Sequence, residues 1–113
     1  MEQILMDSFD RMRQAGHIEG LLGKAQLEVS IVLEEMNWLV KIHGSDIRVE
    51  RVLESPETAD VLIKGEKDDL QSLFRGEDFL ISMKKREALT VEGDLKDLLL
   101  LESLWYLSKN TVS

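Results

Sequence analysis

Cysteine is absent from this sequence, and proline occurs only once in its 113 residues. A chain without cysteine forms no disulfide and offers no thiolate for zinc binding or nucleophilic catalysis. Pro56 cannot donate a hydrogen bond to a sheet ladder, so it marks a break between strands. Hydrophobic residues make up 43% of the chain and charged residues 32%, which is typical of a globular domain. No linker, repeat or low-complexity segment divides the sequence, and we expect one domain over residues 1–113.

Basic residues are also few. Lysine and arginine number 14 against 22 aspartate and glutamate residues, which gives a formal net charge of −8. A nucleic-acid-binding protein needs clustered cations to neutralise phosphates, so this composition argues against that function. The same acidity disfavours simple electrostatic docking on an anionic membrane. The one basic cluster, Lys84-Lys85-Arg86, is interpreted as a solvated loop or helix end, and a phosphate or headgroup site is the alternative.

Long apolar runs are missing as well. A membrane-spanning helix needs about 20 apolar residues, whereas the longest leucine tract is Leu98 to Leu101. The segment Met1 to Asp7 has neither the basic region nor the apolar stretch of a signal peptide. These absences predict a cytoplasmic protein without stable membrane insertion.

Residues that could carry catalysis or bind a metal are sparse. His17 and His43 are the only histidines, and neither has the spacing of a metal site. Gly44, Ser45 and Asp46 follow His43, but a local turn cannot present a nucleophile, a base and an orienting group together. We therefore predict no catalytic residue, no metal and no cofactor, and a protein that is not an enzyme. The alternative is a cleft that gathers carboxylates from distant segments.

Hydrophobic periodicity predicts a helix followed by three strands. Apolar side chains recur at helical spacing from Glu2 to Gln14, and Gly16 to Gly23 is a short glycine-punctuated helix or loop. From Gln26 the apolar period changes to two, which is typical of a half-buried strand. We expect Asn37 to turn the chain into a second strand, and His43 to Asp46 to turn it into a third, giving an antiparallel meander.

The second half of the sequence alternates strands and helices. Ala59 to Lys64 is predicted as a strand, and Lys67 to Arg75 as a helix that Gly76 ends. A fifth strand is expected around Leu89 and Val91, before the final helix. Between that strand and Gly76, the segment 77–85 is expected to form a helical turn that buries three side chains: Phe79, Leu80 and Met83.

The final helix is apolar nearly all round. Seven leucines, Trp105 and Tyr106 lie between Leu95 and Leu107. At about 100° per residue they form three stripes, which are Leu95/Leu99/Tyr106, Leu100/Leu104/Leu107 and Leu98/Leu101/Trp105. A helix packed on a sheet needs only one apolar stripe, so something must cover the others. Other helices of the chain, a bound ligand or a partner subunit could each do so.

Several motifs resemble those of sterol carrier protein 2 domains. Ser55 to Ile63 resembles the Pro-x-x-Ala-Asp-Val start of a strand, and Asp69 to Gly76 resembles the Asp-Leu-x-x-Leu-x-x-Gly helix that follows it. Leu89 to Asp94 is similar to the strand that ends in Gly-Asp before a leucine-rich helix. Upstream, Trp38 to Ile42 is similar to the tryptophan-bearing second strand.

The resemblance covers most of the chain, from about Gln26 to Leu107, with two departures. One is that the segment from Glu77 to Lys85 is compact. The glycine usual just before the fifth strand is absent, and Arg86 or Glu87 stands there. The resemblance implies an α/β (α+β) fold in which a five-stranded, mainly antiparallel sheet carries helices on one side, among them an N-terminal helix and the leucine-rich C-terminal helix.

Family members bind or transfer sterols, fatty acyl chains and other lipids, so the resemblance implies an apolar ligand in a tunnel between sheet and helices. Desolvation would hold such a ligand. We expect eight side chains to line the tunnel: Phe74, Phe79, Leu80, Met83, Leu98, Leu101, Leu104 and Trp105. The alternative is a non-catalytic interaction module that uses the C-terminal helix to form a homodimer or to dock on an enzyme.

Overall fold

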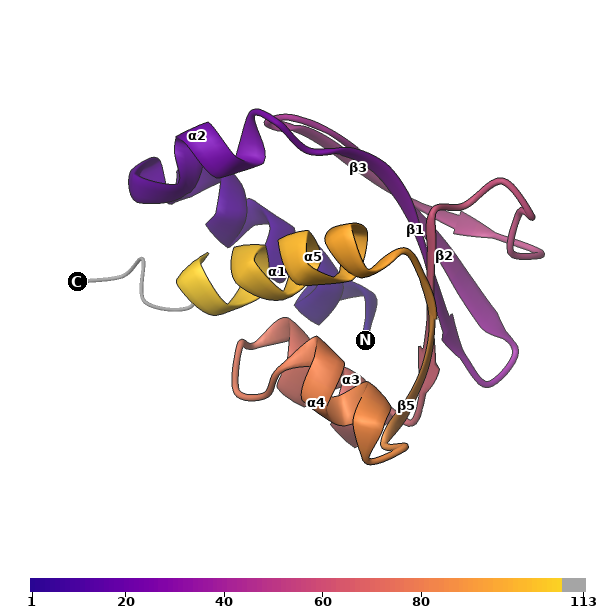
Figure 1. Cartoon of the computed structure of the whole chain (residues 1–113). Coiled ribbons are helices and arrows are strands. Elements are labelled where there is room, and N and C mark those ends of the chain that lie inside the picture. Colours follow the sequence, from indigo (N-terminus) through magenta and orange to yellow (C-terminus); the bar gives the residue numbers. More distant parts are fainter. Residues whose placement is uncertain (109–113) are drawn as a thin grey trace.

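A five-stranded sheet forms the centre of the computed structural model, which describes residues 1–108 (Figure 1). Its strands are β1 (Gln26–Leu33), β2 (Met36–His43), β3 (Asp46–Val52), β4 (Val61–Gly65) and β5 (Leu89–Gly93). They lie in the order β3-β2-β1-β4-β5. Every neighbouring pair is antiparallel except β1 and β4, which run parallel. The predicted five-stranded, mainly antiparallel sheet is therefore confirmed.

The first turn of the meander differs from the sequence-based expectation. Asn37 does not turn the chain, because it lies inside β2 and pairs with Val52 of β3. The turn comes earlier, at Glu34 and Glu35, where Glu34 adopts a positive φ of 55°. Two glutamates are not a typical turn sequence, so the signal at this position was weak. The second predicted turn is confirmed at Gly44 and Ser45.

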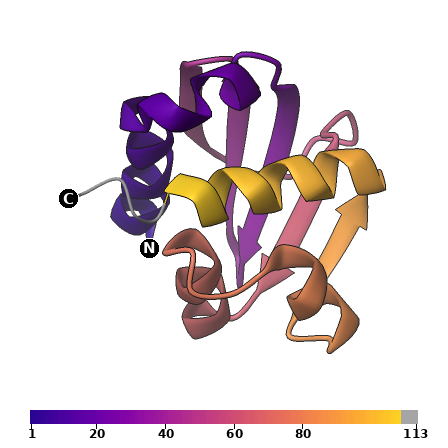
Figure 2. The same cartoon turned by 60° about the vertical axis from the view of Figure 1, so that its left-hand side comes forward.

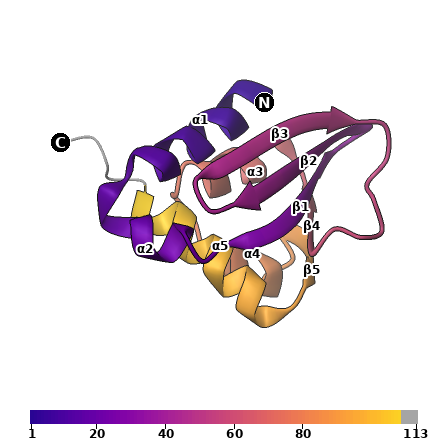
Figure 3. The same ribbon diagram turned by 90° about the horizontal axis from the view of Figure 1, so that it is seen from above.

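All the helices lie on one side of the sheet (Figures 1 and 3). They are α1 (Glu2–Gln14), the 3₁₀ turn η1 (Gly16–Ile18), α2 (Glu19–Leu22), α3 (Lys67–Phe74), α4 (Leu80–Lys85) and α5 (Leu95–Ser108). Figure 2 shows α5 crossing in front of the strands, with α4 below it. The connection between β3 and β4 passes on the opposite side of the sheet. The site between sheet and helices is thus built from both halves of the chain.

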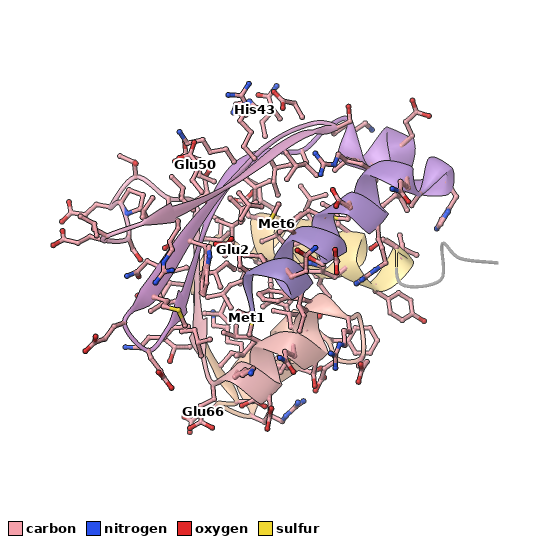
Figure 4. The ribbon with its side chains drawn as sticks, turned by 180° about the vertical axis from the view of Figure 1, so that it is seen from behind. Met1, Glu2, Met6, His43, Glu50 and Glu66 are labelled. Atoms are coloured by element: carbon pink, nitrogen blue, oxygen red, sulfur yellow. The ribbon has the colours of Figure 1, made fainter. Side chains whose placement is uncertain are left out.

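Alternation along the strands directs apolar side chains toward the helices. Val29 and Ile31 of β1, Val40 of β2 and Ile63 of β4 are fully buried in the core between the layers. Glu50 of β3, in contrast, projects from the face without helices (Figure 4). Burial of one face by period-two alternation also fixes the strand register, because a one-residue slip would expose the whole core face.

Two left-handed residues define the ends of the α4 segment. After α3, Gly76 has φ 74°, and its N–H donates to Leu73 O at 3.0 Å. After α4, Glu87 has φ 63°, and its N–H donates to Lys84 O at 3.1 Å. The residue after Glu87, Ala88, donates to Met83 O at 2.9 Å, which completes a Schellman motif. The backbone therefore keeps a conformation that favours glycine at the position where the sequence has Glu87.

Candidate functional site: the apolar layer beneath helix α5

The inner face of α5 is the apolar surface that packs on the sheet and on the other helices. Leu98, Leu101, Leu104 and Trp105 are each at most 2% exposed. These residues recur at spacings of three and four, so they share one side of the helix. The stripe Leu98/Leu101/Trp105, together with Leu104, is therefore the side that faces the core.

Trp105 is the centre of an aromatic cluster. Its ring centroid lies 5.8 Å from that of Phe9 in α1 and 5.5 Å from that of Phe74 in α3. Its indole Nε1–H donates to Ser8 Oγ at 3.3 Å, and the Ser8 hydroxyl donates to Leu5 O at 2.7 Å. Both polar groups are buried, and each donates a hydrogen bond. They therefore leave no unpaired donor in the layer.

The contribution of α1 was not predicted as part of the site. Phe9 was assigned only to an amphipathic helix, and Ser8 was not singled out. Ser8 is a polar residue on the apolar side of α1, between Leu5 and Met12, and it is fully buried. Such a residue indicates a buried hydrogen-bond partner, but the partner lies 97 positions away and cannot be read from local spacing.

Seven of the eight predicted lining residues lie in one buried cluster with the sheet. From α3 and α4 these are Phe74, Leu80 and Met83, each 0% exposed, and the other four are those of α5. In this structure the seven side chains pack against one another and fill the layer. Neither the side chains nor the buried hydroxyls of this layer carry a charge, so the environment suits hydrocarbon and not an ionised group.

Phe79 is the exception, and the expectation that it is buried with Leu80 and Met83 is wrong. It is 43% exposed, and its ring packs on Tyr106 of α5 with centroids 5.1 Å apart. Phe79 is the extended N-cap residue of α4, one position before the first helical turn. The helical spacing assumed for it therefore does not apply, and its side chain lies on the outside of the α4–α5 pair.

The α4 segment is attached to its surroundings by a few polar contacts near the surface. The Ile81 N–H donates to Glu102 Oε1 of α5 at 3.1 Å. The Arg86 guanidinium forms an ion pair with Asp78, which joins the two ends of the segment. Hydrogen bonding to Arg86 lowers the pKa of Asp78, and the same bond raises the pKa of Arg86. Both side chains are partly exposed, so this pair stabilises α4 only modestly.

The outer side of α5 is also apolar. Leu95 is 62% exposed, Leu99 45%, Tyr106 42% and Leu107 41%. Leu95, Leu99 and Tyr106 form one of the three stripes expected from the sequence, and this stripe remains partly exposed although Phe79 packs on Tyr106. The prediction that α5 carries more apolar surface than one interface needs is thus confirmed.

The hollows on the surface lie elsewhere and have a different chemistry. One of them, with a volume of about 740 Å³, opens at the edge of the sheet where β1 and β4 end and β5 begins. Five carboxylates and two lysines are among its lining residues, which are Leu33, Glu34, Lys64, Gly65, Glu66, Lys67, Asp68, Asp69, Glu87, Ala88 and Thr90. Such an open, charged hollow does not suit an apolar ligand.

Residues 1–108 lack two further features. Within that range, no group of three or more His, Asp or Glu side chains is arranged to hold a metal ion. Nor does any helix in the same range have the length and apolar character needed to cross a membrane.

Comparison with known proteins supports the fold. The UbiJ-SCP2 ubiquinone synthesis protein superposes with a TM-score of 0.70 at 14% identity, over 88% of this chain and 83% of that one. Sterol carrier protein 2 from Yarrowia lipolytica, in its apo form, gives 0.65 at 19% identity over 96% and 88%. The sec-alkylsulfatase Pisa1 from Pseudomonas sp. gives 0.60 at 18% identity, over 84% of this chain but only 14% of the enzyme.

The family assignment comes from the sequence. None of the curated proteins compared with the chain matches it significantly. The SCP-2 sterol transfer family, however, matches residues 9–105, from the middle of α1 to Trp105. This range includes all five strands and nearly all of the apolar layer. The chain therefore belongs to the SCP-2 sterol transfer family.

Proposed function

We propose that this protein binds an apolar molecule, such as a lipid or a fatty acyl chain, between the sheet and α5. The observation that carries the proposal is the composition of this layer in a member of the SCP-2 sterol transfer family. The layer is apolar and uncharged, apart from the satisfied hydroxyl and indole of Ser8 and Trp105. A hydrocarbon chain gains about 0.8 kcal/mol for each CH₂ group that leaves water for such surroundings.

The side chains proposed to contact the ligand are those that face the layer from three helices. They are Phe74, Leu80, Met83, Leu98, Leu101, Leu104 and Trp105, with Phe79 at the outer edge. Because these groups pack together without ligand, a bound chain would have to displace some of them. Met83 is an unbranched, flexible side chain and can adapt to such a change more readily than the branched leucines.

Entry of a ligand would require the α4–α5 pair to move away from the sheet. The α4 segment lies between two left-handed residues, Gly76 and Glu87, and only six residues of it are helical. The hydrogen bond from the Ile81 N–H to Glu102 attaches it to α5 near the surface. We therefore propose that the ligand passes beneath α4, with the sheet as the fixed wall.

Paired substitutions on the two sides of α5 test the proposal. Leu101→Asp places a carboxylate in the layer, where it should abolish uptake of a fluorescent fatty acid. Leu99→Asp introduces the same charge on the exposed side of the same helix and should leave uptake close to that of the unmodified protein. Circular dichroism identifies the variants that remain folded, and Leu101→Ser serves as a milder substitution. Undiminished uptake by a folded Leu101 variant would contradict the proposed site.

A further inference from the structure

We propose that two copies of this chain pair through strand β3, so that their sheets join into one. Strand β3 is an edge of the sheet, because it comes first in the order β3-β2-β1-β4-β5. The occupant of this edge is the β3 of a second copy, which runs antiparallel to it across a two-fold axis. This inference goes beyond the proposed binding of an apolar ligand and concerns a different surface of the molecule.

The backbone of β3 has hydrogen-bonding groups that point away from its neighbour β2. A two-residue turn, 44–45, precedes Asp46, which therefore forms a hydrogen-bonded pair with the end of β2. Hydrogen-bonded and non-hydrogen-bonded pairs alternate along an antiparallel ladder. The even-numbered residues of β3 thus bond to β2, whereas the N–H and C=O groups of Ile47, Val49 and Arg51 point outward.

A contact from α1 agrees with this direction. The Arg13 guanidinium donates to Ile47 O at 3.3 Å, and α1 lies beside β3 at this edge of the molecule (Figure 3). The side chain of Arg13 is 41% exposed, so a second strand can displace it. The outward groups of Val49 and Arg51 have no hydrogen-bond partner within residues 1–108. An open edge of this kind is a template for another strand.

The charges of β3 make two copies complementary in one register. With Val49 on the two-fold axis, its outward groups meet those of the other Val49, and Ile47 meets Arg51 of the second copy. Arg48 then stands directly opposite Glu50 of the second copy, and Glu50 opposite Arg48. Both are non-hydrogen-bonded pairs, in which the side chains approach most closely. The register thus forms two ion pairs between the copies.

Both charged side chains are accessible on the face of the sheet without helices. Glu50 projects from that face, and Arg48 shares it because the two residues are two positions apart in one strand (Figure 4). Glu50 takes part in none of the three ion pairs formed within the described range, 1–108. Arg48 Nε lies 3.6 Å from Asp46 Oδ1, but 71% of the arginine side chain is exposed. It can therefore reach a second carboxylate.

The neighbouring registers place like charges together. With the two-fold axis at Arg48, two arginines face each other and Asp46 faces Glu50. With the axis at Glu50, two glutamates face each other. Like charges directly opposite one another destabilise a strand pair. The charge pattern therefore selects the register centred on Val49.

The other edge strand lacks this complementarity. The only charged residue of β5 is Glu92. Two copies of β5 would contribute charge of one sign, which no register can pair. We therefore assign the contact to β3.

Sedimentation equilibrium of charge-exchange variants tests the interface. The unmodified protein should form a dimer that dissociates on dilution, because one strand pair is a small interface. Arg48→Glu and Glu50→Arg, each alone, place like charges opposite one another and should weaken dimerisation by about tenfold or more, since each change affects two cross-strand pairs. An equimolar mixture of the two variants should restore the dimer, because opposite charges then face each other at both positions.

Two controls separate this register from the net charge and from the side chains. Lys24→Glu and Glu57→Lys change the net charge by the same amounts at exposed positions outside β3, and each variant should dimerise alone. Arg51→Pro removes an outward N–H without removing a bond to β2, so it should abolish the dimer. Arg51→Ala keeps that N–H and should retain the dimer. Circular dichroism identifies the variants that remain folded.

Three results would overturn the pairing proposal. They are a monomeric unmodified protein at every concentration, a mixture of the charge-exchange variants that associates no more than each variant alone, and a dimer that Leu95→Glu with Leu99→Glu dissociates but the β3 variants do not. The last result would assign the contact to α5. Ligand content is measured separately by mass spectrometry, so a monomer that retains a lipid contradicts only the pairing proposal.

Discussion

Glu87 adopts a backbone conformation that favours glycine. Its φ of 63° lies in the left-handed region, which a residue with a Cβ adopts at a cost that glycine avoids. We expect Glu87→Gly to increase the free energy of unfolding by about 0.5–1 kcal/mol, because relief of this strain outweighs the added freedom of the unfolded chain. Urea denaturation measures the change. Glu87→Ala is the matched control, since it removes the charge but keeps the Cβ, and it should give no comparable gain.

The ion pair between Asp78 and Arg86 makes a pH-dependent contribution to stability. Hydrogen bonding to Arg86 lowers the pKa of Asp78 in the folded state. A carboxyl group with a lowered folded pKa stabilises the protein above its unfolded pKa of about 4, and the contribution disappears as pH falls through the folded pKa.

The corresponding variant is Asp78→Asn. It should lower the melting temperature slightly at pH 7, and the difference from the unmodified protein should vanish in strong acid. Thermal melts across this range provide the measurement. A difference that persists unchanged below the pKa would show that Asp78 acts through something other than its charge.

Among the elements, helix α5 has two sides that differ in exposure. Leu101 is 0% exposed on the inner side and Leu99 is 45% exposed on the outer side. Leu101→Ala should destabilise the protein by about 2–5 kcal/mol, because it leaves a cavity in the core. Leu99→Ala should cost well under about 1 kcal/mol, because its surroundings are largely solvent. Chemical denaturation of both variants checks this asymmetry, and equal losses would contradict the two-sided arrangement.

Features of these elements that depend on neighbouring residues could be predicted from the sequence, whereas those that depend on contacts between distant residues could not. Period-two alternation was enough to find β1, and the excess apolar surface of α5 followed from its composition. Periodicity alone does not identify the buried stripe of α5, because all three are apolar, although the stripe expected to line the tunnel is the one that is buried. That choice depends on Phe9 and Phe74, which reach Trp105 from distant parts of the chain.

The remaining errors have local causes. Asn37 is a typical turn residue, yet pairing with Val52 holds it in a strand. Phe79 lies just before α4, so helical spacing could not place its side chain. For the site, sequence supplied seven residues that the fold brings into one layer, whereas the hydroxyl of Ser8 was missed because its partner is not local.

At the scale of the whole molecule, the proposed function makes the sheet the fixed wall and the helices the layer that moves. Five apolar side chains of the strands are 0% exposed, and β1 is paired on both sides. In contrast, α4 is short and lies between two left-handed residues. Under the proposed function, the helices would move to admit a hydrocarbon chain while the sheet keeps its register.

The central claim is that this layer holds an apolar ligand, and native mass spectrometry of the gently purified protein tests it most directly. We expect a reproducible adduct with the mass of a lipid, recoverable by organic extraction. If the purified protein carries none, we expect an adduct after incubation with fatty acids or sterols. Leu99→Asp should retain the adduct and Leu101→Asp should lose it. A bare mass that persists after both incubations, in folded protein, would contradict the proposed function.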